Sequence, residues 1–205
     1  ANRLASIRED YPDAAYFSLM NLLDSHDTER LLWTLTPGAE TRAGKELNAA
    51  NVAMGKEKLR LAALIQFTLA GAPTVYYGDE VGLTGDDDPD DRRTMPWSGK
   101  DQDKKLLDFY EELAKLREKT SPLRSGDTRF LLADDAAGTV AYARIAGDDG
   151  AVVVLNRSDA GSEFHVPVGG TLPNGTELET GLTVGTVDVG GSRAMQQTYF
   201  FVRGT

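Results

Sequence analysis

Asn21-Leu-Leu-Asp-Ser-His-Asp-Thr-Glu-Arg30 is the stretch that decides the fold of this chain. It joins an apolar run, Phe17 to Leu23, to the adjacent polar residues His26 and Asp27. An apolar run of this length is typical of a β-strand that is buried on both faces. Parallel α/β folds build their sites at the carboxyl ends of such strands. The stretch therefore predicts a functional site at His26 and Asp27.

Helices and strands are predicted to alternate after this site. Apolar spacing predicts a helix over 52–69, a short buried strand over 75–77 and a second helix over 100–119. Gly71 and Pro73 would end the first helix. Periodicity alone thus predicts a β-α-β-α order, which is an α/β fold.

The pattern changes after Pro122. Short runs rich in strand-forming residues, separated by Asp- and Gly-rich turns, predict an antiparallel β-sandwich. These runs are Phe130–Leu132, Val140–Ile145, Ala151–Leu155, Phe164–Val168 and Tyr199–Val202. Alternation within the fourth run places His165 on the solvent side, and Asn174-Gly175 predicts a hairpin turn.

Composition narrows the class of protein. The formal net charge of −10, with 40% hydrophobic and 26% charged residues, indicates a globular chain that neither spans a membrane nor is disordered. No basic stripe could neutralise phosphates, so nucleic acid is not an expected partner. No apolar run approaches the length of a membrane helix, so a membrane is not an expected partner either. The absence of cysteine excludes thiolate zinc sites and cysteine nucleophiles. It leaves the compartment open, with a bacterial cytoplasmic and a secreted location as alternatives.

Two motifs resemble those of one enzyme family. The Leu-Leu-x-Ser-His-Asp-Thr-x-Arg wording of residues 22–30 resembles the fourth conserved region of the α-amylase family of glycoside hydrolases, in its neopullulanase and cyclomaltodextrinase branch. The stretch Gly71-Ala-Pro-Thr-Val-Tyr-Tyr-Gly-Asp-Glu80 is similar to the family's conserved segment at the eighth barrel strand. Asp24 departs from the pattern, since close relatives often carry glycine there. From Glu80 we expect a structural hydrogen bond and no catalysis.

The resemblance implies an architecture of α/β plus all-β type. Residues 1–121 would form the carboxyl-terminal portion of a catalytic (β/α)8 TIM barrel, namely its last two β/α units. Residues 122–205 would form the C-terminal antiparallel β-sandwich domain that follows the barrel in this family.

The resemblance also implies residue roles. In that family the His and Asp of the fourth region bind sugar hydroxyls, and the Asp is the third catalytic carboxylate, which implies a substrate-binding role for His26 and a catalytic role for Asp27. The alternative is that Asp27 caps the next segment and that His26 is a satisfied core histidine. Losing a catalytic Asp27 should cost roughly 3–5 kcal/mol of transition-state stabilisation.

The segment Gly85-Asp-Asp-Asp-Pro-Asp-Asp-Arg-Arg-Thr-Met-Pro-Trp97 carries a third resemblance. It is similar to the Asp-Pro-x-x-Arg segment of neopullulanase-like enzymes, which implies that Asp88 and Arg92 contact sugars on the non-reducing side of the cut. Trp97 could stack on a sugar, although we expect it to pin the loop to the barrel. The alternatives for the acidic run are a calcium loop or a solvated loop, and its spacing does not follow an EF-hand. No cofactor is required, and calcium is an alternative for the parent enzyme.

Retaining hydrolysis requires two further carboxyl groups, a nucleophile and a general acid/base. The family carries them in an Arg-x-Asp and a Glu-x-x-His-like stretch, and neither precedes Asn21. We therefore expect a C-terminal part of a longer enzyme, inactive alone. Its exposed edges would be covered by a missing N-terminal barrel segment, or in a homodimer by a second copy.

The function implied is hydrolysis of α-glucans such as maltodextrin, starch, pullulan or cyclodextrin, by double displacement at α-1,4 links, with α-1,6 links as a further option. A transglycosylase would share every residue named. A non-catalytic scaffold and a starch-binding module are alternatives from other classes. The starch-binding module would need exposed aromatic side chains, and strand alternation is expected to place part of Tyr142, Tyr199 and Phe200 in the core.

Overall fold

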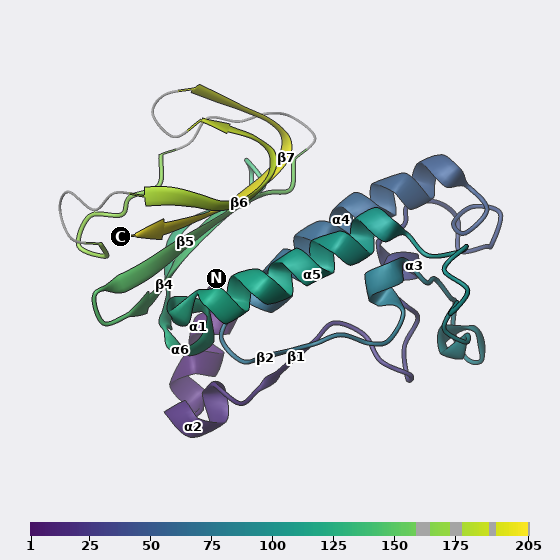
Figure 1. The fold of residues 1–205 in the computed structure, drawn as a ribbon, viewed down its shortest axis with the longest axis horizontal. Coiled ribbons are helices and arrows are strands. Elements are labelled where there is room, and N and C mark those ends of the chain that lie inside the picture. Colours follow the sequence, from purple (N-terminus) through teal and green to yellow (C-terminus); the bar gives the residue numbers. More distant parts are fainter. Residues whose placement is uncertain (159–164, 173–177, 189–191, 205) are drawn as a thin grey trace. The chain divides into compact units, whose positions relative to one another are not determined.

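The chain folds into two compact units in the computed structural model, which describes residues 1–158, 165–172, 178–188 and 192–204, with side chains up to residue 172. One unit, here called the site unit, comprises Met20–Phe67 and Pro73–Lys115. The other, here called the sheet unit, comprises Ala1–Leu19, Thr68–Ala72 and Leu116–Thr205. Figure 1 shows the elements of both units in chain order.

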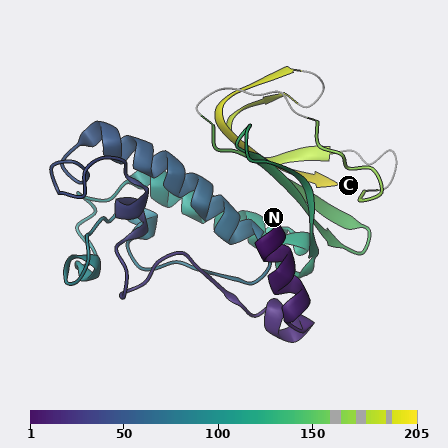
Figure 2. The same cartoon turned by 180° about the vertical axis from the view of Figure 1, so that it is seen from behind.

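Helices and short strands make up the site unit. Its elements are β1 (Met20–Leu22), α3 (Leu31–Leu35), α4 (Ala49–Thr68), β2 (Ala72–Thr74), the 3-10 turns η1 (Asp79–Val81) and η2 (Asp90–Arg92), and α5 (Lys104–Lys119). The strands β1 and β2 form a two-stranded sheet, and α4 runs beside α5 in both views of the ribbon (Figures 1 and 2). Phe67 of α4 meets Tyr110 of α5 edge to face, with ring centroids 6.0 Å apart.

Both predicted helices are confirmed. In α5, Leu106, Phe109, Tyr110 and Leu113 are buried, as their spacing predicts. The helix begins after Asp103, whose carboxylate accepts the backbone N–H of Leu106 at 3.0 Å, which is the usual role of an N-cap residue. In α4, Leu59, Ala63, Leu64 and Thr68 are buried, while Leu61 and Ile65 are half-buried.

The predicted strands of this unit are corrected by the structure. Only Met20–Leu22 of the predicted run from Phe17 to Leu23 is extended, and both Met20 and Leu22 are exposed. The second strand lies at Ala72–Thr74, ahead of the predicted 75–77. A tertiary contact accounts for the shift, because the side-chain amide of Gln66 donates at 2.8 Å to the carbonyls of both Asn21 and Thr74.

The sheet unit contains α1 (Asn2–Asp10), α2 (Asp13–Tyr16), α6 (Ser121–Ser125) and a five-stranded sheet. Neighbouring strands are antiparallel in the order β3-β4-β5-β7-β6. Their bounds are Asp127–Asp134 for β3, Thr139–Ala146 for β4, Asp149–Asn156 for β5, Leu178–Asp188 for β6 and Ser192–Gly204 for β7. The predicted strands at 130–132, 140–145, 151–155 and 199–202 are confirmed. The described strands belong to this single sheet, so the sandwich stays a prediction.

The core of this sheet is built from small and branched side chains. It consists of Ala141, Ala143, Val152, Val154 and Leu172, with Val166 and Val168 packed against it. Residues 165–168 are not a strand, so the expected strand over 164–168 is wrong for the part that is described. The alternation nevertheless holds, since His165 is exposed while Val166 and Val168 turn inward. Phe164 and Asn174-Gly175 lie outside the described residues.

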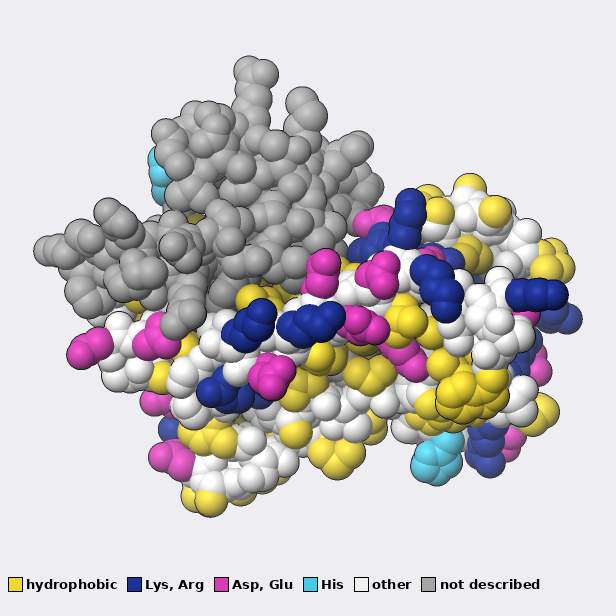
Figure 3. Space-filling model, viewed as in Figure 1, with side chains coloured by type: hydrophobic (Ala, Val, Ile, Leu, Met, Phe, Trp, Pro, Cys, Tyr) yellow, Lys and Arg dark blue, Asp and Glu magenta, His cyan; other side chains and the backbone are white. Residues whose placement is uncertain are grey.

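The surface of the described part is mixed in charge. Figure 3 shows acidic and basic side chains interspersed over the described residues of one face. Among the helices that the structure describes, none is both long and apolar enough to cross a membrane.

Candidate active site

His26 and Asp27 lie at the tip of the histidine loop, which comprises residues 23–30 between β1 and α3. Their side chains are 66% and 73% exposed, and His26 Nε2 lies 3.5 Å from Asp27 Oδ1. The loop is shaped by Ser25, whose hydroxyl accepts the N–H of Asp27 at 3.2 Å and whose own N–H donates to the Thr28 hydroxyl at 3.2 Å. Both side chains are therefore available to a ligand, and the alternative of a core histidine is wrong.

The alternative reading has Asp27 capping the next segment, but the structure gives this bond to Asp24. Asp24 Oδ2 accepts the N–H of Leu31, the first residue of α3, at 2.8 Å. Asp27 makes no such bond among the described residues, and its own carboxylate is left at the surface beside His26.

The second group of predicted residues meets the first. Asp88 and Arg92 lie in the acidic loop, defined as residues 85–97. The Arg92 Nε–H donates to the carbonyl of His26 at 3.1 Å, and Arg92 Nη2 lies 3.4 Å from Asp88 Oδ2. All four predicted residues, His26, Asp27, Asp88 and Arg92, are thus joined by contacts within the site unit.

The carboxylates of the acidic loop are mostly paired with arginine or with the backbone. Asp90 lies 2.6 Å from Arg93, and Arg93 also pairs with Glu46 at 2.8 Å. Asp91 is buried, with Arg92 at 3.8 Å. Within the described residues, no three His, Cys, Asp or Glu side chains are grouped so that they could hold a metal ion. The arrangement therefore resembles a hydrogen-bonding surface more than a cation cage.

Beneath the histidine loop lies a buried charged cluster that sequence reasoning missed. Asp24, Arg30 and Asp79 are 6%, 0% and 3% exposed. Arg30 donates to the carbonyl of Tyr77 at 2.6 Å, and its guanidinium lies over the rings of Tyr76 and Tyr77 at 4.4 and 4.6 Å from their centroids. Arg30 Nη1 is 3.7 Å from Asp79 Oδ1.

Burial and the neighbouring Asp24 carboxyl raise the pKa of Asp79 to about 9. An ionised Asp79 would place a second negative charge beside Asp24 in the interior, and a neutral Asp79 carboxyl avoids this.

Glu80 and Trp97 complete the description of these loops. Glu80 Oε2 accepts the N–H of Gly78 at 2.8 Å, which confirms the expected structural hydrogen bond. Trp97 is 84% exposed, so packing within the described residues does not pin the acidic loop through this side chain.

Family models match both parts of the chain. The model described as "Alpha amylase, catalytic domain" matches residues 3–115, more than half of the chain. This chain belongs to the α-amylase family. A second model, described as "Neopullulanase-like, C-terminal domain", matches residues 129–199.

Relatives of this chain include proteins named as enzymes. A cyclomaltodextrinase of Geobacillus thermopakistaniensis (strain MAS1) is 36% identical over 168 residues, which is 82% of this chain and 26% of that enzyme. Neopullulanase 2 of Thermoactinomyces vulgaris is 42% identical over 153 residues, 75% of this chain and 23% of that enzyme. The chain therefore spans about a quarter of the length of these two relatives.

Solved structures of similar proteins share the fold of this chain. The match to one structure, named cyclomaltodextrinase, covers 98% of this chain and 32% of that chain, with a TM-score of 0.74 and 31% identity. An α-amylase of Anoxybacillus covers 97% of this chain and 40% of its own, with a TM-score of 0.75 and 26% identity.

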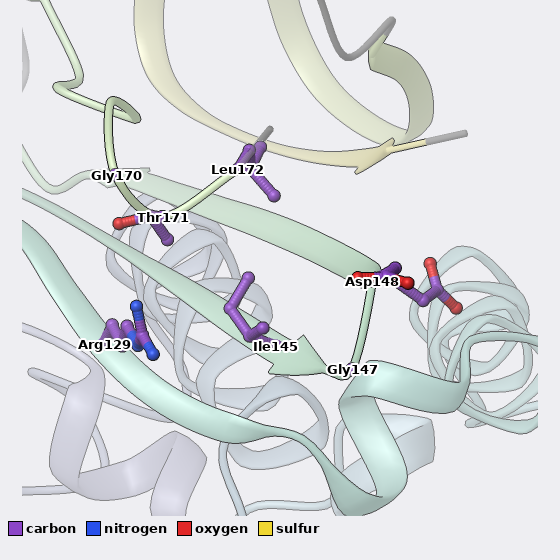
Figure 4. A pocket seen from close by; sticks show the side chains of 8 residues that line it. Arg129, Ile145, Gly147, Asp148, Gly170, Thr171 and Leu172 are labelled. Carbon is purple, nitrogen blue, oxygen red and sulfur yellow. The ribbon is translucent and has the colours of Figure 1, made fainter. Parts of the chain in front are cut away.

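The sheet unit of this α-amylase family member contains a cavity of about 340 Å³ at one end of β4 and β5. Figure 4 shows Ile145 and Leu172 between Arg129 on one side and Asp148 on the other. No aromatic side chain lines it among the described residues, so a sugar would find no flat ring to stack on. Tyr142 is buried, as expected, and the side chains of Tyr199 and Phe200 lie outside the described part.

Proposed function

We propose that this chain is part of a retaining hydrolase of α-glucans, in which Asp27 stabilises the transition state and His26, Asp88 and Arg92 hold the sugar on the donor side of the cut. The observation that supports the proposal is the contact between the histidine loop and the acidic loop, in which the Arg92 side chain donates to the His26 carbonyl at 3.1 Å. The names of the relatives, cyclomaltodextrinase and neopullulanase, support substrates of the maltodextrin and pullulan class, with α-1,4 and α-1,6 links.

The chemistry requires a carboxylate where Asp27 lies. Cleavage passes through an oxocarbenium-like state in which the ring flattens and gains positive charge. A carboxylate that accepts hydrogen bonds from ring hydroxyls holds the flattened ring more strongly than the relaxed ring. The exposed tip of the histidine loop leaves Asp27 and His26 free to make these bonds, and the Arg92 and Asp88 pair supplies donors and acceptors for the neighbouring sugar.

In this proposal, residues 1–121 are the last two β/α units of a (β/α)8 barrel and residues 122–205 form its C-terminal β-sandwich. The nucleophile and the general acid/base are supplied by a barrel segment outside this chain, since retaining hydrolysis needs both. The complete enzyme, meaning this chain with that segment, is the active form, and the chain alone should not release sugar from maltodextrin.

Asp27→Asn in the complete enzyme tests the proposal. The kcat for maltodextrin hydrolysis should fall by about 10²- to 10⁴-fold, because the amide cannot balance the developing charge. The matched control is Asp108→Asn, an exposed position on α5, which should retain the wild-type rate. Wild-type activity in Asp27→Asn, or hydrolysis by the isolated chain, would refute the assignment.

A further inference from the structure

Few contacts among the described residues hold the tip of the histidine loop in place. The side chains of His26 and Asp27 are mostly exposed, and apart from the bonds with Ser25 and Thr28 the tip is held by the Arg92 contact to the His26 carbonyl. A catalytic carboxylate must be fixed to within a fraction of an ångström. Among the described residues, the further groups that hold this loop lie at its base.

Both ends of the loop are buried and charged. At one end, Asp24 accepts the N–H of Leu31 at 2.8 Å and so closes the loop on itself. At the other end, the backbone N–H of Arg30 donates to the Gly85 carbonyl at 3.1 Å, which ties the histidine loop to the start of the acidic loop. The Arg30 side chain adds its bond to the Tyr77 carbonyl at 2.6 Å.

The surroundings of Arg30 are shaped to receive it. Its guanidinium lies over Tyr76 and Tyr77, an arrangement that favours a cation on the face of an aromatic ring. Gly78 has a φ of 97°, and a Cβ there would lie 3.2 Å from Arg30 Nη1 and 2.7 Å from Leu83. Only glycine allows this close approach. Asp79 is the ionic partner of this guanidinium, with its Oδ1 3.7 Å from Arg30 Nη1.

We infer that Asp24 and Arg30 are positioning residues, which act as a buried clamp that sets the orientation of His26 and Asp27 toward the sugar. This inference rests on the proposed function. Asp24 and Arg30 touch no substrate, and they act through the loop that they close.

The test uses the complete enzyme with kcat and KM for maltodextrin. Asp24→Leu removes the acceptor for Leu31 at similar volume, and kcat should fall by about ten- to a hundredfold with KM changed less, because a displaced carboxylate loses mainly transition-state contacts. Asp24→Asn keeps an acceptor oxygen and should restore kcat to within about threefold of wild type. A merely structural role would give no such split between kcat and KM below the unfolding temperature.

The control is Asp103→Ala, which removes the α5 cap and should lower stability without changing kcat. If Asp24→Leu does not fold, Arg30→Lys replaces it, because lysine keeps the charge and loses the planar contacts, and it should show the same kcat loss. A wild-type kcat in Asp24→Leu, or in Arg30→Lys where the leucine variant is unfolded, would overturn the inference. Retained activity in Asp27→Asn would instead overturn the proposed function.

Discussion

Trp97 exposes most of its ring at the end of the acidic loop. An exposed indole is suited to stack on the apolar face of a sugar ring. We predict that Trp97→Ala in the complete enzyme weakens maltodextrin binding by about 1–2 kcal/mol, or about 5- to 30-fold in Kd, while thermal stability is unchanged. Leu47→Ala, another exposed apolar position, is the control for lost surface area. Equal sugar affinity in wild type and Trp97→Ala would contradict this role.

The raised pKa of Asp79 predicts that the stability of the chain depends on pH. Its folded-state pKa of about 9 lies above the ordinary value near 3.8, so the folded chain binds the extra proton between those pH values. The stability contributed by this group is therefore full below about pH 4 and is lost as pH rises toward 9. The groups that face it are Asp24, Arg30, Glu80 and Tyr110.

Denaturant unfolding of the chain at pH 5, 7 and 9 measures this effect. Asp79→Asn is a permanently neutral isostere and should show a shallower fall of unfolding free energy with pH than wild type. The same pH slope in both proteins would show that Asp79 does not take up the proton.

For single residues, the sequence reveals which ones belong to a motif better than it reveals which ones are buried. His26, Asp27, Asp88 and Arg92 were found because they stand in recognisable patterns, and the structure brings them into contact. The buried charged cluster of Asp24, Arg30 and Asp79 was missed because charged residues are seldom buried, and only tertiary contacts show that these are.

Among the elements, α5 depends on its cap. Asp103 accepts the N–H of Leu106 at 3.0 Å and pairs with Lys56 at 2.7 Å. We predict that Asp103→Ala lowers the unfolding free energy by about 1–2 kcal/mol in denaturant titration of the chain. Asp101→Ala, at an exposed position just outside the helix, should change it by less than about 0.5 kcal/mol. Equal effects of the two substitutions would show that the cap bond does not stabilise α5.

The elements also differ in how far the sequence predicts them. Helices α4 and α5 are long, periodic and bounded by local signals, so the sequence places them to within a few residues. Strands β1 and β2 are three residues each, and their place is set by the bridging amide of Gln66. Strand β6 was missed because Gly181 and Gly185 interrupt its alternating pattern, and glycine disfavours strands.

In the whole molecule, the exposed groups of the site and the buried clamp are expected to act together. The side chains proposed to touch sugar are exposed, while the buried clamp at the base of the histidine loop sets the geometry of that loop. Met20 and Leu22 of β1 are exposed, and in the proposed complete enzyme a further barrel segment would cover them. In this proposal, catalysis needs the complete enzyme, whereas both residues of the clamp lie in this chain.

The central claim is that Asp27 grips a distorted sugar more strongly than a relaxed one. The direct measurement compares how Asp27→Asn changes the Kd of a ring-flattened transition-state analogue and the Kd of maltodextrin in the complete enzyme. The account predicts that analogue binding weakens by about 10²- to 10⁴-fold while substrate binding weakens by less than about tenfold. Equal losses for the analogue and the substrate would contradict it.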